Sequence, residues 1–390
     1  MRPSRAALLG AWLLAAHPLA AQAPPVVVLS GATPIPAAEF TRLGGLVELT
    51  ADTLLVSDPR ESILWKVPVA GGRMVRAAPS GGGPGDFRIP SKIYRGAADS
   101  IVVLDGQTQR FTVFTPALRY ARDFTVRRAA AFRVRGVDLA GAVYYEETLE
   151  RYRGGGEGLN AGARSRPRND DSVPALRLHL AAQDLDTVAW LRLPPPRRQQ
   201  LSLVSEAPGG HSRDLPFGEQ DDWAVNRAGL VAVVRGAGYT VDWYRAGRLE
   251  RRSPPITRER VAVTEAEQDA WWATHQGDSI GTFTCNDPKC LVWHHPPRPT
   301  DWAATKNPFE PRSLILTDEE ELWLQRAGRA GDAMVRYDVV TPAGGPWEVR
   351  LPVGRRIVAV TERWVYATWT DEDDVVRLER YRRPVLSRRP

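Results

Sequence analysis

The stretch DTLLV (52–56) sets a pattern that recurs along the chain: a small or charged pair is followed by at least three apolar residues. It returns in DSIVV (99–103), GAVYY (141–145), AGLVAVV (228–234), EELWL (320–324) and ERWVYA (362–367). The first apolar residues of successive copies are 47, 42, 87, 92 and 42 positions apart. Three of these intervals match one four-stranded blade of a β-propeller, and two are longer by about 45 residues. The pattern predicts an all-β fold, a six-bladed β-propeller with four-stranded antiparallel blades and two insertions.

Strand-like runs flank each copy on both sides, as a four-stranded blade requires. We expect the innermost strands upstream, in LVEL (46–49), KIY (92–94), FRVRGV (132–137), WAV (223–225), SLIL (313–316) and RIVAV (356–360). The third strands are expected downstream, in ILWKV (63–67), RFTVF (110–114), LRLHLA (176–181), YTVDWY (239–244), MVRYDVV (334–340) and VVRLERY (375–381). Runs this short cannot bury both faces alone, so the blades must pack face to face around an axis.

Closure of the ring is expected to involve the two ends of the chain. The sixth unit lacks an outer strand, because the sequence stops shortly after VVRLERY (375–381). The run VVVL (26–29) has no partner of its own and is predicted to supply that strand.

The first residues have the features of a secretory signal peptide. Arg2 and Arg5 precede the apolar run 6–16, and small residues follow at Ala21 and Ala23. We therefore expect residues 1–23 to be removed and residues 24–390 to form one propeller, with insertions at about 148–175 and 253–310. The apolar run is too short to span a bilayer permanently. The mature protein is predicted to be periplasmic or secreted.

The charge composition argues against nucleic-acid binding. Lys and Arg total 52 against 46 Asp and Glu, and only Lys66, Lys92, Lys289 and Lys306 are lysines. Acidic residues are interspersed almost everywhere, without a basic stripe of the kind that nucleic acid requires. We expect no nucleic-acid partner, no membrane span and a monomer.

The resemblance at motif level is to the NHL and TolB-like class of six-bladed propellers. An Asp followed at fixed spacing by apolar or Arg positions occurs twice, in Asp58 with Ile63, Leu64 and Val67, and in Asp105 with Arg110, Phe111 and Phe114. The Gly-rich junction GGGPGDFRIP (81–90) is similar to one between the first blades of that class. Arg235 departs from the pattern, since it stands where the fourth turn would have Asp. This class hosts enzymes, receptors and scaffolds, so the resemblance implies a fold more than an activity.

Asp58 and Asp105 allow two interpretations. They could be metal-binding or catalytic carboxylates, or each could end a strand and accept backbone N–H bonds in the following turn. Their repetition at equivalent blade positions favours the structural role. GGGPGDF (81–87) lacks the Lys-Ser/Thr ending of a phosphate-binding loop and is expected to be a turn.

Cys285 and Cys290 are the only cysteines, and in an exported chain we expect them to form a disulfide. A Cys₂His₂ metal site with His294 and His295 is the alternative. Adjacent His side chains seldom reach one metal together, so no metal site is predicted.

The second insertion also carries helix and aromatic signals. Thr264 and Glu267 form a capping-box pattern, which predicts a helix that begins at Thr264. Trp271, Trp272 and Trp293 lie in the same insertion and could cap one channel mouth and stack on a sugar or peptide. The alternative is that they pack the insertion onto the propeller. The first insertion, at 151–171, is rich in Gly and Arg and is expected to be a mobile loop.

Basic residues stand at or near the start of five of the six expected inner strands: Arg42, Lys92, Arg133, Arg312 and Arg356. Inner strands line the channel, so these residues predict a positive mouth that attracts an anionic ligand. Arg is frequent throughout the sequence, and coincidence also accounts for the pattern.

Taken together, these features predict a non-catalytic binding or scaffold module for a protein, peptide or glycan, without a cofactor. The alternative is a metal-dependent hydrolase or lactonase that holds Ca or Zn in the axial channel. Such an enzyme needs carboxylates and amides at the inner strands, where this sequence has mostly basic and apolar residues. No Ser-His-Asp order is assigned, because the His residues fall in insertions.

Overall fold

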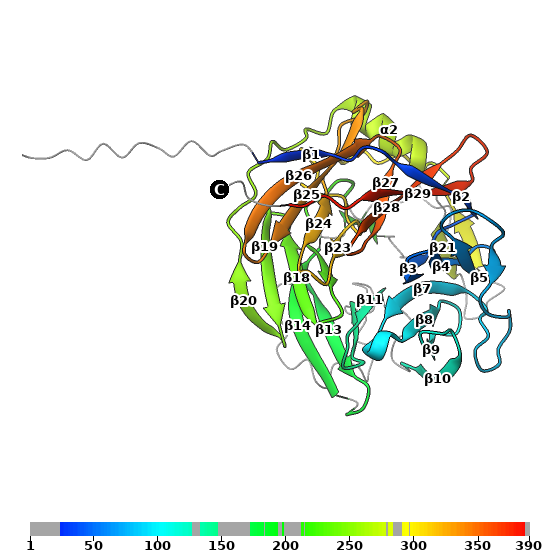
Figure 1. The fold of residues 1–390 in the computed structure, drawn as a ribbon. Coiled ribbons are helices and arrows are strands. Elements are labelled where there is room, and N and C mark those ends of the chain that lie inside the picture. The colour runs from blue at the N-terminus through cyan, green and yellow to red at the C-terminus, as the bar shows by residue number, and fades with distance from the viewer. Residues whose placement is uncertain are drawn as a thin grey trace, which may run out of the picture.

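The computed structural model describes residues 24–126, 133–146, 172–182, 184–193, 197–198, 212–213, 215–277, 280–283, 291–295 and 297–386. These residues form a ring of six sheets around a central axis, each with four antiparallel strands (Figure 1). The predicted six-bladed β-propeller is confirmed. The predicted signal peptide, the loop 151–171 and the Cys285–Cys290 disulfide lie outside the described residues and stay predictions.

Blades 1 to 3 run from the inner to the outer strand in chain order. Blade 1 consists of β3 (Gly45–Thr50), β4 (Thr53–Asp58), β5 (Ile63–Pro68) and β6 (Val75–Arg76). Blade 2 consists of β7 (Pro90–Arg95), β8 (Ile101–Asp105), β9 (Arg110–Phe114) and β10 (Tyr120–Thr125). Blade 3 consists of β11 (Arg133–Val137), β12 (Val143–Glu146), β13 (Ser172–His179) and β14 (Asp184–Arg192).

The remaining blades include both strands from the start of the chain. Blade 4 consists of β17 (Asp222–Val225), β18 (Leu230–Arg235), β19 (Thr240–Arg245) and β20 (Arg248–Arg252). Blade 5 consists of β23 (Ile315–Leu316), β24 (Leu322–Gln325), β25 (Met334–Thr341) and β26 (Gly344–Pro352), with β1 (Val26–Val28) added outside. Blade 6 consists of β27 (Arg356–Val360), β28 (Trp364–Thr370), β29 (Val376–Arg382) and β2 (Thr33–Phe40).

Three smaller elements lie between blades. The helix α2 (Glu265–His275) and the hairpin β21 (Ile280–Phe283) and β22 (Leu291–His294) belong to the connection from blade 4 to blade 5. The short pair β15 (Arg197–Arg198) and β16 (Ser212–Arg213) lies between blades 3 and 4. No helix of the described residues is long and apolar enough to cross a bilayer.

The repeated apolar runs are explained by burial on both faces of the second strand. In β4, Leu54 and Val56 pack with Tyr366 of blade 6, whereas Leu55 packs with Ile101 of blade 2. Because successive side chains of a strand point to opposite faces, a strand enclosed by two neighbouring blades must be apolar at every position. This packing is why the second strand gives the clearest signal in the sequence.

The predicted closing segment is wrong, although a neighbouring segment, β2, does close the ring. The run 26–29 pairs in parallel with β26 of blade 5, and β2 pairs with β29 as the outer strand of blade 6. Ile35 and Phe40 of β2 are 3% and 2% exposed, whereas Val26 and Val28 remain 48% and 54% exposed. Burial of alternate β2 side chains therefore selects the less apolar segment for closure.

Asp58 and Asp105 have the structural role that their repetition favours. Asp58 is buried and accepts N–H bonds from Arg60 and Glu61 in its own turn and from Thr41 and Arg42 in the preceding loop, at 2.8–3.3 Å. Asp105 does the same with Gln107, Thr108, Arg88 and Ile89, at 2.7–3.4 Å. Each carboxylate thus fixes the loop that leads into an inner strand.

In blade 4, the loop that leads into the inner strand is held by an arginine and two aspartates instead of by a single Asp. Arg235 occupies the turn position and pairs with Asp221 at 2.7 Å and with Asp242 at 2.9 Å. Asp221 lies in the loop before the inner strand and accepts the N–H of Gly236 at 3.1 Å. The Gly-rich segment 81–87 is a turn, as predicted, closed by the N–H of Gly81 on the carbonyl of Phe87 at 2.9 Å.

Strand direction places both insertions on one face of the ring. The turn between second and third strands opens on the same face as the connection from one blade to the next inner strand. The first insertion joins β12 to β13 and the second joins β20 to β23, so both are on this face, named here the insertion face. The starts of the inner strands lie on the insertion face as well.

Ring closure by β2 makes a direct prediction. Phe40→Ala removes a buried ring between blades 6 and 1 and should lower the free energy of unfolding by about 3–5 kcal/mol. Val28→Ala, at a half-exposed position of β1, should change it by less than about 0.5 kcal/mol. Urea unfolding of the mature chain measures both. Equal losses, or a larger loss at Val28, would contradict closure by β2.

Candidate functional site

The five basic residues predicted at the channel mouth fall into two opposite groups of blades. Arg42 precedes β3 of blade 1, Lys92 is on β7 of blade 2 and Arg356 begins β27 of blade 6. These three residues define the first arc. Arg133 begins β11 of blade 3 and Arg312 precedes β23 of blade 5. All five side chains are exposed to solvent.

The first arc is a cluster of cations around Lys92. Enclosure by the surrounding protein lowers the pKa of Lys92 from 10.5, and Arg356, Arg135 and Arg42 lower it further. Within the described residues, the Lys92 ammonium has no ion pair, and every charged group that shifts its pKa is a guanidinium. Among the described residues, the charge of Lys92 is therefore not neutralised by a carboxylate.

Arg135 joins the first arc to the opposite side of the channel. It pairs with Glu146 of blade 3 at 3.0 Å and with Asp222 of blade 4 at 2.7 Å. Both carboxyl groups are buried, and Glu146 also accepts the indole N–H of Trp223 at 2.7 Å. Arg133, Arg135 and Arg312 with these two acids define the second arc.

The acids of the second arc are already occupied by protein donors. Asp222 accepts the backbone N–H groups of Trp223 at 2.8 Å and Arg312 at 2.5 Å, besides Arg135. Burial raises the pKa of Asp222, although Arg135 opposes the shift. Enclosure by the protein lowers the pKa of the Arg312 guanidinium, and Arg133 and Arg135 lower it further, whereas Glu146 and Asp222 raise it. Within the described residues Arg312 makes no ion pair of its own, because Glu146 and Asp222 are paired with Arg135.

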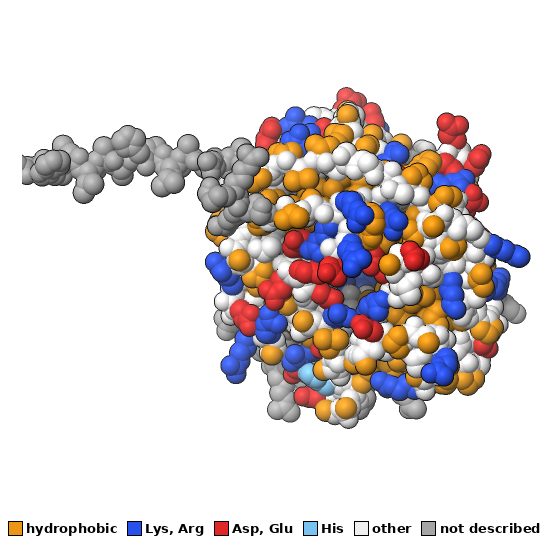
Figure 2. Space-filling model, viewed as in Figure 1, with side chains coloured by type: hydrophobic (Ala, Val, Ile, Leu, Met, Phe, Trp, Pro, Cys, Tyr) orange, Lys and Arg blue, Asp and Glu red, His pale blue; other side chains and the backbone are white. Residues whose placement is uncertain are grey.

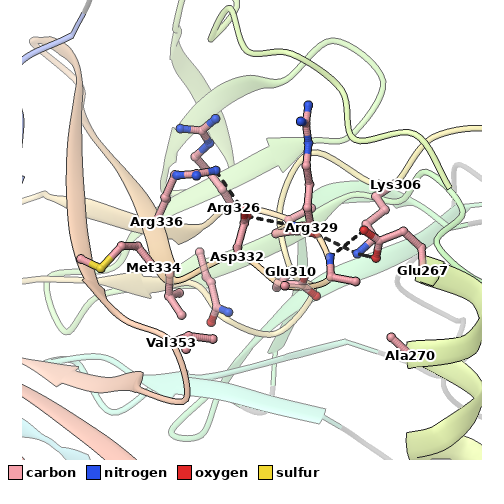
Figure 3. A pocket seen from close by; sticks show the side chains of 16 residues that line it. Glu267, Ala270, Lys306, Glu310, Arg326, Arg329, Asp332, Met334, Arg336 and Val353 are labelled. Carbon is pink, nitrogen blue, oxygen red and sulfur yellow. Dashed lines mark hydrogen bonds and ion pairs between the residues drawn. The ribbon is translucent and has the colours of Figure 1, made fainter. Parts of the chain in front are cut away.

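A separate cavity of about 260 Å³ lies on the insertion face of blade 5 (Figure 3). Its walls come from α2, from the turn 326–333 between β24 and β25, and from Val353 after β26. Glu267 and Ala270 line it from the helix side, and Met334 lines it from the blade.

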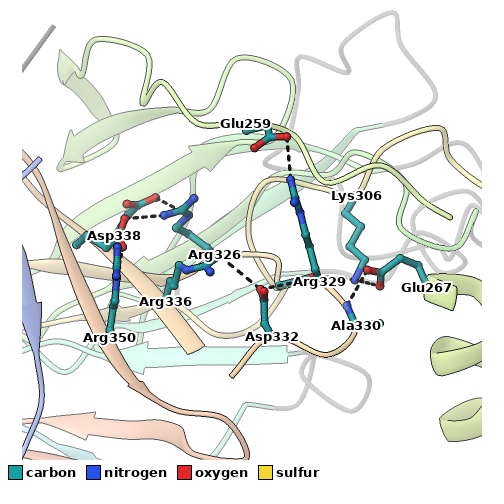
Figure 4. A network of polar contacts seen from close by, with 12 residues as sticks. Glu259, Glu267, Lys306, Arg326, Arg329, Ala330, Asp332, Arg336, Asp338 and Arg350 are labelled. Atoms are coloured by element: carbon teal, nitrogen blue, oxygen red, sulfur yellow. Dashed lines mark hydrogen bonds and ion pairs between the residues drawn. The ribbon is translucent and has the colours of Figure 1, made fainter. Parts of the chain in front are cut away.

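The charges around this cavity neutralise one another (Figure 4). Lys306 pairs with Glu267 at 2.5 Å, and Arg329 pairs with Glu259 at 2.8 Å. The two other cations in the wall are also paired, Arg326 with Glu348 at 2.8 Å and Arg336 with Asp332 at 3.4 Å. The cavity therefore differs from the mouth, where Lys92 and Arg312 are unpaired.

Glu310 connects the cavity with the first arc. It lines the cavity, and burial raises its pKa while Lys306 and Arg356 act in the opposite direction. In the segment before β23, Glu310 thus interacts with Arg356 of the first arc, and Arg312 interacts with Arg133 and Arg135 of the second.

The helix forms where the sequence predicts it, but the capping box does not. Thr264 is the N-cap residue of α2, and its side chain makes no capping hydrogen bond. Glu267 is buried and instead binds Lys306 and the backbone N–H of Ala330, at 2.7 Å. In place of the expected cap, Glu267 pairs with Lys306 inside the insertion and fastens the insertion to blade 5 through the N–H of Ala330 in the turn between β24 and β25.

The aromatic residues of the insertion whose contacts are described pack against protein. Trp271 stacks on His275, with ring centroids 4.0 Å apart, and meets Trp302 edge-on at 5.4 Å. Trp302 in turn lies 6.1 Å from Phe217, in the segment before blade 4. Trp272 is half-buried on the same helix, and the side chain of Trp293 lies outside the described part of the chain. These contacts support the packing role.

Charged side chains of both signs gather near the centre of the ring in the space-filling view (Figure 2). Among the described residues, no group of three or more His, Cys, Asp or Glu side chains is arranged to hold a metal ion.

Sequence reasoning missed Arg135, Glu146 and Asp222. Arg135 was detectable, since it shares a strand face with Arg133 two positions earlier. Glu146 ends the second strand of blade 3 and Asp222 begins the inner strand of blade 4. Their convergence on one guanidinium depends on how neighbouring blades are placed, which the repeat pattern does not specify.

No family model and no curated protein matches the sequence. Among solved structures, the chain is similar to a member of the DUF4221 family from Bacteroides vulgatus, with 7% identity and a TM-score of 0.46 over 90% of this chain and 95% of that one. It is also similar to the calcium-binding protein regucalcin from Agrobacterium tumefaciens, with 10% identity and a TM-score of 0.40 over 92% and 97% of the two chains. A streptogramin B lyase matches with 10% identity and a TM-score of 0.39, over 90% and 97%.

The charge cluster should reduce stability at neutral pH. Because the pKa of Lys92 is lowered on folding, the unfolded chain binds that proton more tightly, and stability rises with pH from the lowered pKa up to 10.5. Lys92→Gln should therefore raise the Tm at pH 7, and its advantage over the natural chain should shrink as the pH approaches 10.5. Thermal unfolding across this pH range measures the effect, with Lys66→Gln on the third strand of blade 1 as control. A lower Tm for Lys92→Gln at pH 7 would contradict the charge cluster.

Proposed function

We propose that this protein is an exported, non-catalytic β-propeller of the NHL and TolB-like class that binds a protein, peptide or glycan through anionic groups of that ligand. The observation that carries the proposal is the environment of Lys92, whose charged neighbours Arg356, Arg135 and Arg42 are all cations. The ligand would occupy the channel mouth on the insertion face.

The energetics of the mouth support an anionic ligand. Cations that face each other across a water-filled opening repel, and the walls of the channel weaken solvent screening between them. An anion that enters the mouth removes this repulsion and gains charge-assisted hydrogen bonds from guanidinium groups. The same field draws anions from solution and repels cations.

The alternative hydrolase function receives no comparable support. A catalytic divalent cation needs carboxylates, amides or imidazoles at the inner strands. The inner-strand positions at this mouth present Lys92, Arg356 and Arg312, which repel a cation. Glu146 and Asp222, the carboxyl groups that act on Arg312, are bound to Arg135.

Binding of citrate tests the proposed function. The natural chain should bind citrate in low-salt calorimetry, and the Lys92→Gln/Arg356→Gln double variant should lose at least about tenfold in affinity, because charged hydrogen bonds are lost. Arg248→Gln/Arg251→Gln on the exposed outer strand of blade 4 removes the same charge and should bind like the natural chain.

Two results would contradict the proposal. One is equal citrate affinity in the two double variants, which would place binding away from the mouth. The other is stoichiometric calcium or zinc in the protein purified without chelator, together with metal-dependent hydrolysis of lactones or esters.

A further inference from the structure

The two arcs identify the kind of ligand more closely, if the mouth binds anions as proposed. The first arc belongs to blades 6, 1 and 2, and the second belongs to blades 3, 4 and 5. The two arcs therefore occupy opposite halves of the ring. A ligand that contacts both Lys92, on the inner strand of blade 2, and Arg312, before the inner strand of blade 5, must reach across the mouth.

Each arc includes cations that make no ion pair among the described residues. In the first arc Arg42, Lys92 and Arg356 make none, and Lys92 has only guanidinium groups among its charged neighbours. In the second arc Arg312 makes none, because Glu146 and Asp222 are engaged by Arg135 and by N–H donors. Arg312 and Arg356 are also coupled, since the Arg356 guanidinium donates to the Arg312 carbonyl at 3.1 Å. One small anion can neutralise one arc, whereas two or more linked anionic groups can neutralise both.

The aromatic contacts distinguish between a glycan and a polypeptide. Sugar binding by stacking needs an exposed aromatic face. Trp271 has one face against His275, at 4.0 Å and nearly parallel, and its neighbour Trp302 contacts it edge-on. Among the described residues, Trp271 and Trp302 thus serve the packing of the insertion, and the groups described at the mouth are charged.

An acidic polypeptide matches this pattern of charges. Asp and Glu carboxylates accept paired hydrogen bonds from the planar guanidinium of Arg. Along an extended chain, successive residues are spaced by about 3.3–3.6 Å, so a short acidic run presents carboxylates at several points across the mouth.

We propose that the ligand of this propeller is an acidic segment of another polypeptide, rich in Asp and Glu, that crosses the channel mouth and contacts both arcs at once. Lys92 and Arg312 are the residues that distinguish such a ligand from a single anion. This inference rests on the proposed function and goes beyond it by naming the ligand class.

Three probes test the inference on the chain from residue 24 onward. They are an oligoglutamate peptide, a heparin oligosaccharide with the same total charge as that peptide, and citrate. Fluorescence anisotropy or calorimetry at several salt concentrations measures their affinities. The oligoglutamate should bind at least about tenfold more tightly than citrate, since it engages both arcs. Its affinity should fall by about tenfold in Lys92→Gln and again in Arg312→Gln, and Lys92→Arg should restore it.

The single variants also separate the two arcs. Citrate should lose affinity in Lys92→Gln and much less in Arg312→Gln, because it reaches one arc. Arg248→Gln/Arg251→Gln serves as the control for net charge, and circular dichroism confirms that each variant is folded.

The outcomes distinguish this inference from the function on which it rests. If no anion binds in a Lys92-dependent way, both fail. If citrate binds through Lys92 but oligoglutamate is no tighter, or if Arg312→Gln leaves oligoglutamate binding intact, the acidic-segment inference fails alone. Tighter binding of the heparin oligosaccharide than of oligoglutamate would assign the mouth to anionic glycans instead.

Discussion

The pairing of β2 with β29 is the interaction on which the rest of the structure depends. A four-stranded blade buries its apolar faces only when it has a neighbour on each side, so an open ring would expose two of them. β2 completes blade 6 and inserts Ile35 and Phe40 into the interface with blade 1. Closure fixes the position of every inner strand, and with them the six basic side chains around the channel.

The cations at the channel mouth differ from those around the cavity on blade 5 in whether they have carboxylate partners. Around the cavity on blade 5, every wall cation has a carboxylate partner, and Glu267 fastens the insertion to blade 5 through the N–H of Ala330. At the mouth, Lys92 and Arg312 have none among the described residues. Uncompensated charge lowers stability, and such local costs concentrate where a protein binds or reacts. This contrast within one molecule is the physical reason for assigning binding to the mouth.

Most of the fold could be predicted from the sequence because the packing of each blade between two others requires an apolar run that recurs once per blade. The central positions of the second strands are consecutive apolar residues, and Asp58 and Asp105 repeat at the ends of two of these strands. The closing strand was missed because TPIPAAEF (33–40) contains Pro34 and Pro36, which an outer strand tolerates, while VVVL (26–29) has the stronger β propensity. The choice between the two segments depends on which one can bury side chains between blades 6 and 1.

The candidate site was predictable only in part. Basic residues at inner-strand starts follow from the repeat, and the structure places Arg42, Lys92 and Arg356 in one arc. Which cations lack partners depends on contacts between blades, as in the convergence of Glu146 and Asp222 on Arg135. In the same way, the capping-box pattern gave the start of α2 but not the use of Glu267, which depends on a residue far along the chain, Lys306.

The pKa of Lys92 tests the central claim most directly. The chain has four lysines, so ¹³C-methylation of their amino groups gives few NMR signals to assign and titrate. Our account predicts that Lys92 titrates below 10.5 in the free protein and that its pKa rises when the oligoglutamate peptide is bound. An ordinary pKa that the peptide does not change would contradict an uncompensated cationic mouth.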